Sequence, residues 1–218
     1  MLTVYGVYRS RASRVYWMVE ELGIPIQSVP VIQARRIENP LAADAPFNTR
    51  SPEFLDINPM GLIPCIKDGD LIMHESLAIT LYLERKYGAG ASRSAEEDGQ
   101  VTMWSLWAAT EIEPHSVRIV LTYDNGLDAQ EEGRNVISSS VEKLRAPLTV
   151  LDRHLATREW LVGGQFTAAD LNLAEVLRYA QTERRLFDAN PNVEAWIKRC
   201  QSRPAYKAMQ AKRGLEPA

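Results

Sequence analysis

Short apolar runs alternate with helical patterns at the start of the chain. Residues 2–5 predict a strand, residues 12–22 a helix and residues 28–32 a second strand. The apolar positions of the helix follow the spacing i, i+3, i+4 and i+7, at Val15, Met18, Val19 and Leu22. Gly23 comes directly after the last of them as a stop signal. The chain therefore begins with a predicted unit of strand, helix and strand.

A short helix and a hairpin are predicted next. Ser51 and Pro52 have the residue types of an N-cap and of a first helical position. Farther along, the pair Asp-Gly at 68–69 separates the apolar runs 63–67 and 71–73. Because this pair favours the tight turn that joins antiparallel strands, the two runs predict a β-hairpin.

A change of pattern then divides the chain. Residues 75–87 predict a helix, and the small residues that follow it predict a linker. Beyond the linker we find helical periodicity and no convincing strand. We therefore predict an α/β domain over residues 1–88, a linker over 89–94 and an all-helical domain over 95–218.

Helical signals continue through the second domain. Apolar residues in steps of four and three predict a long helix, at Ile137, Val141, Leu144, Leu148, Leu151 and Leu155. Thr167 and Asp170 have the spacing of a capping box, so we assign Asp170 to folding and not to acid catalysis. Pro191 and Pro204 predict the starts of two further helices.

The bulk composition favours a small-molecule partner. The 218 residues are 45% hydrophobic, which is enough to bury a core. Lys and Arg number 25 against 28 Asp and Glu, for a net charge of -3, so no basic field attracts nucleic acid or an anionic membrane. Arginines interrupt the N-terminal stretch where a signal peptide needs an apolar run. We expect a cytoplasmic protein that binds neither nucleic acid nor membrane.

The sequence predicts no metal site and no redox centre. Cys65 and Cys200 are far apart and form no CxxC pair, which disfavours a disulfide scaffold, a zinc ribbon and a dithiol centre. Glu111, Glu113 and His115 are close in sequence, but residues two apart point to different sides of a helix. Any thiol chemistry therefore has to use a thiol that the protein binds.

Three motifs in a fixed order narrow the choice of fold class and of function. They are Asn-Pro-Met-Gly-Leu-Ile-Pro at 58–64, Glu-Ser at 75–76, and Gly-Gly-Gln-Phe-Thr-Ala-Ala-Asp at 163–170. In this order they resemble the cytosolic glutathione transferase family over nearly the whole chain. The segment 10–14 is similar to the bacterial-type, serine-type members. The resemblance implies an α/β plus all-α fold, in which a thioredoxin-like domain of order βαβαββα precedes a helical bundle.

The resemblance implies a glutathione site in the N-terminal domain, with glutathione as co-substrate and no metal. In the family, a cis proline and the residue before it bind the cysteinyl part of glutathione; here these are Pro64 and Ile63. Glu75 would meet the ammonium group of the γ-glutamyl part. Ser76 would hold its carboxylate at a helix N-terminus, where free N–H groups and the helix dipole favour an anion.

The resemblance also implies a residue that stabilises the glutathione thiolate. Ser10 is our first choice, with its hydroxyl donating a hydrogen bond to the sulfur and Arg11 or Arg14 assisting. Tyr5 and Ser13 remain alternatives, because some members use a tyrosine near the end of the first strand and Ser13 lies in the first helical turn. Lowering a thiol pKa of about 8.5 by about two units needs about 2.7 kcal/mol. One or two charge-assisted hydrogen bonds supply that much.

A second, hydrophobic and electrophilic substrate needs a pocket of its own. By resemblance, Tyr8 and Trp107 are the candidate walls of this pocket, although aromatic residues on bundle helices often serve simply as core. The connection over residues 33–54 is longer than is usual in the family. In it, Arg35 and Arg36 are candidate contacts for the glycyl carboxylate of glutathione, and a solvated loop is the alternative.

We therefore expect a homodimeric detoxification enzyme, a glutathione transferase whose bound thiolate attacks an electrophilic carbon or reduces a peroxide. A glutathione-dependent isomerase or dehalogenase would use the same site. A disulfide oxidoreductase is disfavoured because residue 10 is serine. A non-catalytic scaffold protein of the same fold is the remaining alternative, against which the intact site motifs argue.

Overall fold

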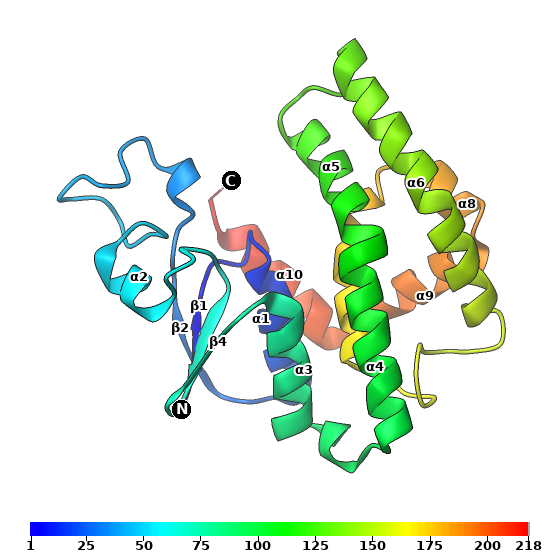
Figure 1. The fold of residues 1–218 in the computed structure, drawn as a ribbon, viewed down its shortest axis with the longest axis horizontal. Coiled ribbons are helices and arrows are strands. Elements are labelled where there is room, and N and C mark those ends of the chain that lie inside the picture. Colours follow the sequence, from blue (N-terminus) through cyan, green and yellow to red (C-terminus); the bar gives the residue numbers. More distant parts are fainter. Residues whose placement is uncertain (218) are drawn as a thin grey trace. The chain divides into compact units, whose positions relative to one another are not determined.

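The described part of the chain falls into two compact units. A computed structural model describes residues 1–217 (Figure 1). The first unit consists of Met1–Ala91 and of the stretch that begins at Pro204, and the second unit is Ser92–Arg203. The short connection Ala89–Ser92, where we predicted a linker, is one turn of 3₁₀ helix. The two ends of the chain thus contribute to one unit.

The last helix, α10 (Pro204–Leu215), belongs to the first unit because it packs against α1 (Ala12–Leu22). The ring of Tyr206 meets the ring of Trp17 edge-on, with 4.8 Å between the centroids, and Trp17 is fully buried. In this respect the structure differs from the predicted all-helical domain over residues 95–218, because the stretch from Pro204 belongs to the first unit. The C-terminal helix has an apolar face for α1, and helical periodicity alone does not say which unit that face covers.

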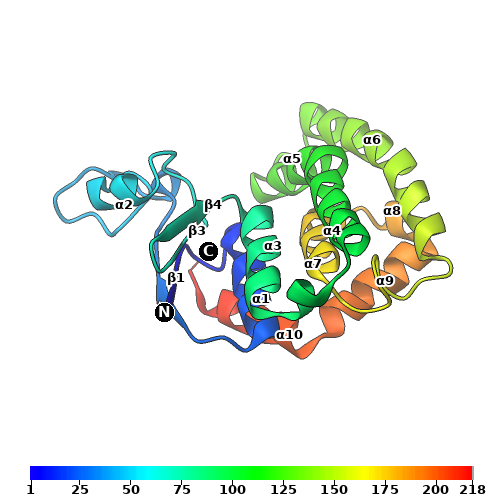
Figure 2. The same cartoon turned by 60° about the horizontal axis from the view of Figure 1, so that its bottom comes forward.

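A four-stranded sheet forms the centre of the first unit, in the order β2-β1-β3-β4. Its strands are β1 (Leu2–Tyr5), β2 (Ile26–Val29), β3 (Cys65–Asp68) and β4 (Leu71–His74). β2 is parallel to β1, β3 is antiparallel to β1, and β4 is antiparallel to β3. Helices α1 and α3 (Ser76–Tyr87) lie on one face of the sheet and α2 (Pro52–Ile57) on the other (Figures 1 and 2). This arrangement confirms the predicted thioredoxin-like domain.

Prolines set two strand boundaries that differ from the prediction. The second strand covers Ile26–Val29 instead of 28–32, because Pro30 has no N–H with which to continue the ladder to β1. The third strand begins later than predicted, at Cys65, directly after Pro64. The hairpin turn between β3 and β4 lies where the Asp-Gly pair predicts it.

One carboxylate fastens the hairpin to α3. Asp68, at the end of β3, accepts hydrogen bonds from Tyr82 at 2.8 Å, Lys86 at 2.7 Å and Tyr87 at 2.7 Å. Burial by itself would raise the pKa of the Asp68 carboxyl, but these hydrogen bonds outweigh it and lower the pKa below its usual range. The second half of α3 is thereby fastened to the hairpin, at the end of the helix away from Ser76.

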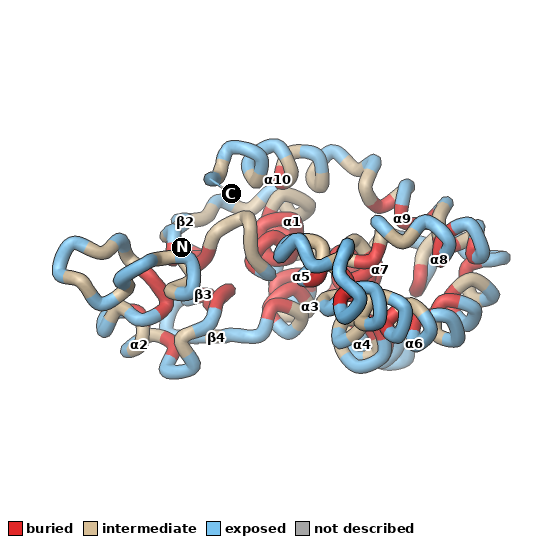
Figure 3. Tube along the Cα trace, turned by 90° about the horizontal axis from the view of Figure 1, so that it is seen from above, coloured by how far each residue is buried: buried red, intermediate tan, exposed pale blue. Residues whose placement is uncertain are grey.

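Helices make up the second unit, and residues 92–203 form no strand, as predicted. The helices are α4 (Ala95–Trp107), α5 (Glu113–Asp124), α6 (Glu131–Leu155), α7 (Ala168–Leu177), α8 (Arg184–Asp188) and α9 (Pro191–Ser202). All residues of α7 are buried, so this helix forms the centre of the unit (Figure 3). No helix within residues 1–217 has both the length and the apolar character that crossing a membrane requires.

The predicted capping box at the start of α7 is confirmed. The Asp170 side chain accepts the Thr167 N–H at 3.0 Å and the Thr167 hydroxyl at 3.1 Å. It also accepts the Leu161 N–H at 3.0 Å and the Trp196 indole N–H at 2.8 Å. Burial raises the pKa of Asp170 to about 6, although these hydrogen bonds oppose the rise. Asp170 therefore ties α7 to α9 and to the preceding loop.

Asp170→Ala should lower the free energy of unfolding by about 3 kcal/mol, because the buried donors lose their acceptor. The folded-state pKa of Asp170, about 6, lies above the ordinary carboxyl value, so its contribution is complete at low pH and is lost as the pH rises through 6. The difference between the two proteins should grow from pH 7 to pH 5 in urea unfolding. Asp188→Ala, at an exposed side chain, should change stability by at most about 0.5 kcal/mol.

Candidate functional site

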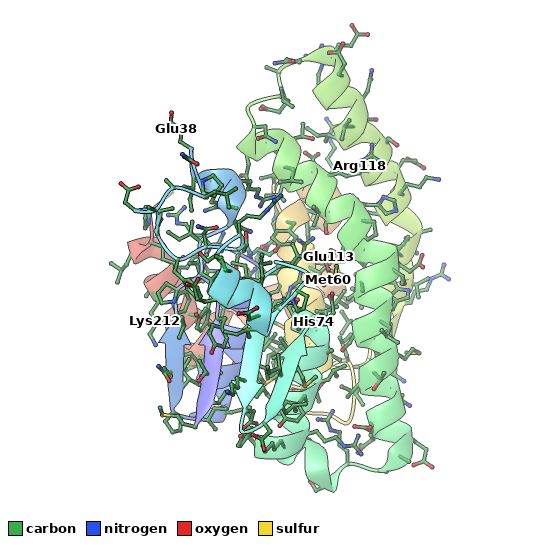
Figure 4. All side chains as sticks on the ribbon, turned by 60° about the vertical axis from the view of Figure 1, so that its left-hand side comes forward. Glu38, Met60, His74, Glu113, Arg118 and Lys212 are labelled. Carbon is green, nitrogen blue, oxygen red and sulfur yellow. The ribbon has the colours of Figure 1, made fainter. Side chains whose placement is uncertain are left out.

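The sheet register brings three segments of the first unit to one end of the sheet. Tyr5, the last residue of β1, pairs with Cys65, the first residue of β3, and Cys65 pairs with His74, the last residue of β4. The loop after β1, the segment before β3 and the start of α3 after β4 therefore meet at this end, which His74 marks in Figure 4. The predicted residues Ser10, Ile63, Pro64, Glu75 and Ser76 all belong to these three segments.

The segment before β3 has a fixed backbone. The peptide bond between Ile63 and Pro64 is cis, as the resemblance implies. The buried side chain of Asn58 holds the preceding loop, since its amide donates to the Leu62 carbonyl at 2.7 Å and its oxygen accepts the Met60 N–H at 3.3 Å. The backbone just before the sheet is thus set by a side chain at the other end of the same motif.

Glu75 stands in an unusual conformation at the start of α3. Within residues 1–217, Glu75 is the one residue other than glycine with a positive φ, at 73°. An L-residue in this region costs on the order of 1–2 kcal/mol, so the surrounding structure has to impose it. The Glu75 carbonyl accepts the Ile79 N–H at 2.9 Å, whereas 79% of its side chain is exposed. The carboxylate is therefore presented to solvent at the helix N-terminus.

The buried guanidinium of Arg14 contacts Ser76, the residue after Glu75. Ser76, the first residue of α3, is 5% exposed, and its hydroxyl accepts a hydrogen bond from Nη1 of Arg14 at 2.9 Å. Arg14 lies on α1 and is 1% exposed. The positive charge adds to the N–H groups and to the positive dipole end of α3. This corner of the site is therefore suited to an anion such as a carboxylate.

Ser10 lies in the loop between β1 and α1 with its hydroxyl already hydrogen-bonded. The hydroxyl donates to the Val7 carbonyl at 2.7 Å and accepts the Ala12 N–H at 3.0 Å. Its oxygen is thus held at the N-terminus of α1, and a rotation of the hydroxyl hydrogen would let it donate to a ligand sulfur instead. The position suits stabilisation of an anion by hydrogen bonding.

The two alternative thiolate-binding residues have other surroundings. The ring of Tyr5 packs against the ring of Phe54, with 6.3 Å between the centroids, beside the apolar cluster under α2. Ser13 lies in the first turn of α1 and is completely buried. Packing accounts for Tyr5, and burial limits the access of a ligand thiol to Ser13.

Tyr8 and Trp107, the candidate pocket walls, belong to different units. The ring of Tyr8 stacks on Tyr16 of α1 at 3.9 Å between centroids and lines a cavity of about 490 Å³ bounded by α1, β2 and α10. Burial raises the pKa of the Tyr8 phenol. Trp107 ends α4 in the second unit, where it meets Trp104 edge-on at 5.2 Å. Their role as pocket walls stays a prediction.

The long connection reaches the loop after β1 through one arginine. Arg36 donates from Nη2 to the Arg9 carbonyl at 3.3 Å, and Arg35 lies beside it in the 3₁₀ helix Ala34–Arg36. Neither side chain is buried. Their contact with a glycyl carboxylate likewise stays a prediction.

Both cysteines are buried and stay protonated. Burial raises the pKa of Cys65 to about 11 and raises that of Cys200 well above its usual value. A thiol must ionise to act as a nucleophile or a metal ligand, so neither cysteine is set up for that chemistry. Among the described residues, no group of three His, Cys, Asp or Glu side chains is placed to hold a metal ion.

Two contacts of this site do not follow from sequence patterns. The resemblance gives Arg14 only an assisting role at the thiolate, whereas in the structure its guanidinium donates a hydrogen bond to Ser76. The sequence feature that could have indicated this contact is a charged residue next to the apolar stripe of α1. The second contact is made by Glu216, whose carboxylate accepts the N–H groups of Tyr8 and Arg9. No local pattern connects residues so far apart in the chain.

Arg14→Met should leave the fold largely intact, because an apolar side chain of similar length fills the same buried space. It should nevertheless weaken the binding of a carboxylate ligand at α3 by about tenfold to a hundredfold, the effect of one lost charge-assisted interaction. Calorimetric titration with glutathione, together with urea unfolding, measures both. Unchanged affinity in a folded Arg14→Met protein would remove Arg14 from the site.

Comparison with known proteins gives matches over most of the chain. The family model described as "Glutathione S-transferase, N-terminal domain" matches residues 4–92, and "Glutathione S-transferase, C-terminal domain" matches residues 110–204. Glutathione S-transferase F10 of Arabidopsis thaliana is 30% identical over 226 residues, covering 99% of each chain. Probable glutathione S-transferase GSTF1 of Oryza sativa subsp. japonica is 33% identical over 173 residues, covering 74% of this chain and 78% of the relative.

Solved structures match in fold as well. The crystal structure of glutathione transferase F7 from Populus trichocarpa superposes with a TM-score of 0.82 at 26% identity, covering 98% of this chain and 99% of that one. A glutathione S-transferase I bound with lactoylglutathione gives a TM-score of 0.80 at 28% identity, with coverage of 97% and 99%. The similarity therefore extends through both units.

Proposed function

Because the chain belongs to the glutathione S-transferase family, we propose that it binds glutathione and activates its thiol for attack on an electrophilic small molecule or a peroxide. One observation carries the proposal: cis Pro64, Glu75 and the Arg14–Ser76 pair lie at the same end of the sheet. These groups match the three needs of the tripeptide: a partner for its backbone, a carboxylate for its ammonium group and an anion site for its γ-glutamyl carboxylate.

Glutathione would bind in an extended form along the segment before β3. The backbone of Ile63 pairs with the cysteinyl part, which directs the thiol toward the loop after β1. Ser76 and the N-terminus of α3 hold the γ-glutamyl carboxylate, with the Arg14 charge behind them. Glu75 holds the ammonium group from its exposed position. The anchoring groups lie on strand and helix ends, which keeps them rigid.

The thiolate is stabilised by Ser10. Its hydroxyl turns from the Val7 carbonyl to the sulfur, while the Ala12 N–H continues to hold the oxygen. The positive end of the α1 dipole lies at the same point and favours S⁻. Ser10 stabilises the charge and takes no proton, so the rate gain comes from the larger thiolate fraction and from positioning.

Several finer features are part of the same proposal. We place the chain among members that use serine for the thiolate. The family assignment itself rests on relatives from plants, and a bacterial-type subclass has no support beyond the N-terminal motif. The electrophile is a hydrophobic small molecule, with Tyr8 and Trp107 as pocket walls, and the enzyme acts as a cytoplasmic homodimer.

Ser10→Ala should raise the pKa of the bound thiol toward the free value of about 8.5 and lower the turnover number by about a hundredfold at pH 6.5. The thiolate absorbance of bound glutathione, followed against pH, measures the ionisation directly. Ser10→Thr keeps a hydroxyl and serves as the matched control. Normal ionisation in Ser10→Ala would transfer the role to Tyr5 or Ser13, and a wild type that ignores glutathione would favour the scaffold alternative.

Glu75→Gly should weaken glutathione binding by about tenfold to a hundredfold through loss of the carboxylate, with stability largely kept. Glycine adopts the φ of 73° without strain, whereas Glu75→Ala loses the carboxylate and keeps the strain. Titration calorimetry and thermal unfolding separate the two effects. Equal affinity in wild type and Glu75→Gly would contradict the assigned role.

A further inference from the structure

The loop that carries Ser10 is held by the last residues of the chain. Glu216 accepts the Tyr8 N–H at its Oε1 and the Arg9 N–H at its Oε2, each at 2.7 Å. Arg213 donates from Nη1 to the Tyr8 carbonyl at 2.6 Å. One carboxylate thus grips two successive backbone amides, in charge-assisted hydrogen bonds whose geometry fixes the orientation of both peptide groups.

The gripped residues are next to the thiol-binding position. Tyr8 and Arg9 lie between Val7, whose carbonyl accepts the Ser10 hydroxyl, and Ser10 itself. A shift of their peptide groups would move both ends of that hydrogen bond. The grip therefore helps to set where the Ser10 oxygen lies.

The segment that supplies the grip is anchored independently. Lys212 of α10, labelled in Figure 4, forms an ion pair with Glu20 of α1. Tyr206, near the start of α10, packs on Trp17. Glu216 follows the end of this helix and is itself half-buried. An anchored helix can hold a carboxylate against the loop, which a loose C-terminus could not do.

We propose that Glu216 is a positioning residue for thiol activation: through Tyr8 and Arg9 it holds Ser10 where its hydroxyl reaches the glutathione sulfur. This inference rests on the proposed function. It assigns to the C-terminal segment a part in the chemistry of the N-terminal unit, with Arg213 as its helper at the Tyr8 carbonyl. In this role Glu216 acts through the peptide groups of Tyr8 and Arg9.

The test compares Glu216→Gln with wild type in the full-length protein. An amide retains one acceptor oxygen and replaces the other with an NH₂ group, which cannot accept the second backbone N–H. We expect the pKa of bound glutathione thiol to rise by about one unit and turnover at pH 6.5 to fall by about tenfold. The dissociation constant of glutathione should stay within about twofold, because Ser76, Arg14 and Glu75 still anchor the tripeptide.

Three further measurements separate positioning from mere stabilisation. The exchange rates of the Tyr8 and Arg9 amide hydrogens should rise in Glu216→Gln, while those of β1 stay as in wild type. Glu38→Gln makes the same change of charge at an exposed side chain on the long connection (Figure 4) and should leave the thiol pKa unchanged. Arg213→Met, which removes the grip on the Tyr8 carbonyl, should shift the thiol pKa in the same direction as Glu216→Gln.

The outcomes are distinct. A raised thiol pKa in both Glu216→Gln and Arg213→Met, with glutathione affinity kept, supports the inference. An unchanged thiol pKa in folded Glu216→Gln overturns it even if the melting temperature falls, because the carboxylate would then be a structural fastening alone. If Glu216→Gln does not fold, Arg213→Met decides by the same readout. Failure of wild type to bind glutathione would overturn the proposed function itself and is recognised before any variant is compared.

Discussion

The buried hydrogen bond between the Arg14 guanidinium and the Ser76 hydroxyl joins the two helices on which the site depends. It sets a full positive charge behind the N-terminus of α3, in a place where water cannot screen it. A buried charge is costly for the fold, and it is most useful when an anionic group of a ligand comes to lie beside it. This corner of the site is therefore suited to a carboxylate.

The rest of the site continues this pattern of rigid anchoring. The cis bond at Pro64 and the positive φ at Glu75 present one backbone segment and one carboxylate in fixed directions. At the other end of β3, Asp68 holds the hairpin against the second half of α3 through three hydrogen bonds from the helix. Under the proposed function the protein contributes position and electrostatics, whereas the reactive sulfur belongs to glutathione.

The N-terminal stretch and the C-terminal helix belong to the same compact unit, so the first unit is not continuous in sequence. Residues 1–88 look like a domain by pattern, yet Trp17 is covered by Tyr206, and the loop beside Ser10 is gripped by Glu216. The helices of the second unit lie between these stretches in sequence. The first unit therefore includes the last helix, and the loop beside Ser10 makes its contacts with that C-terminal segment.

The sequence by itself determined the features that depend on near neighbours. The predictions are confirmed for strand Leu2–Tyr5, helix Ala12–Leu22 and the Thr167–Asp170 capping box. Each of these features depends on a hydrophobic period or a capping pair that lies within a short stretch of sequence. The site motifs could be found because their residues are continuous within each segment. Only the tertiary structure decided that Arg14 bonds Ser76 and that Glu216 holds Tyr8, since these partners are 62 and 208 residues apart. No periodicity spans such distances, and only packing brings the two partners together.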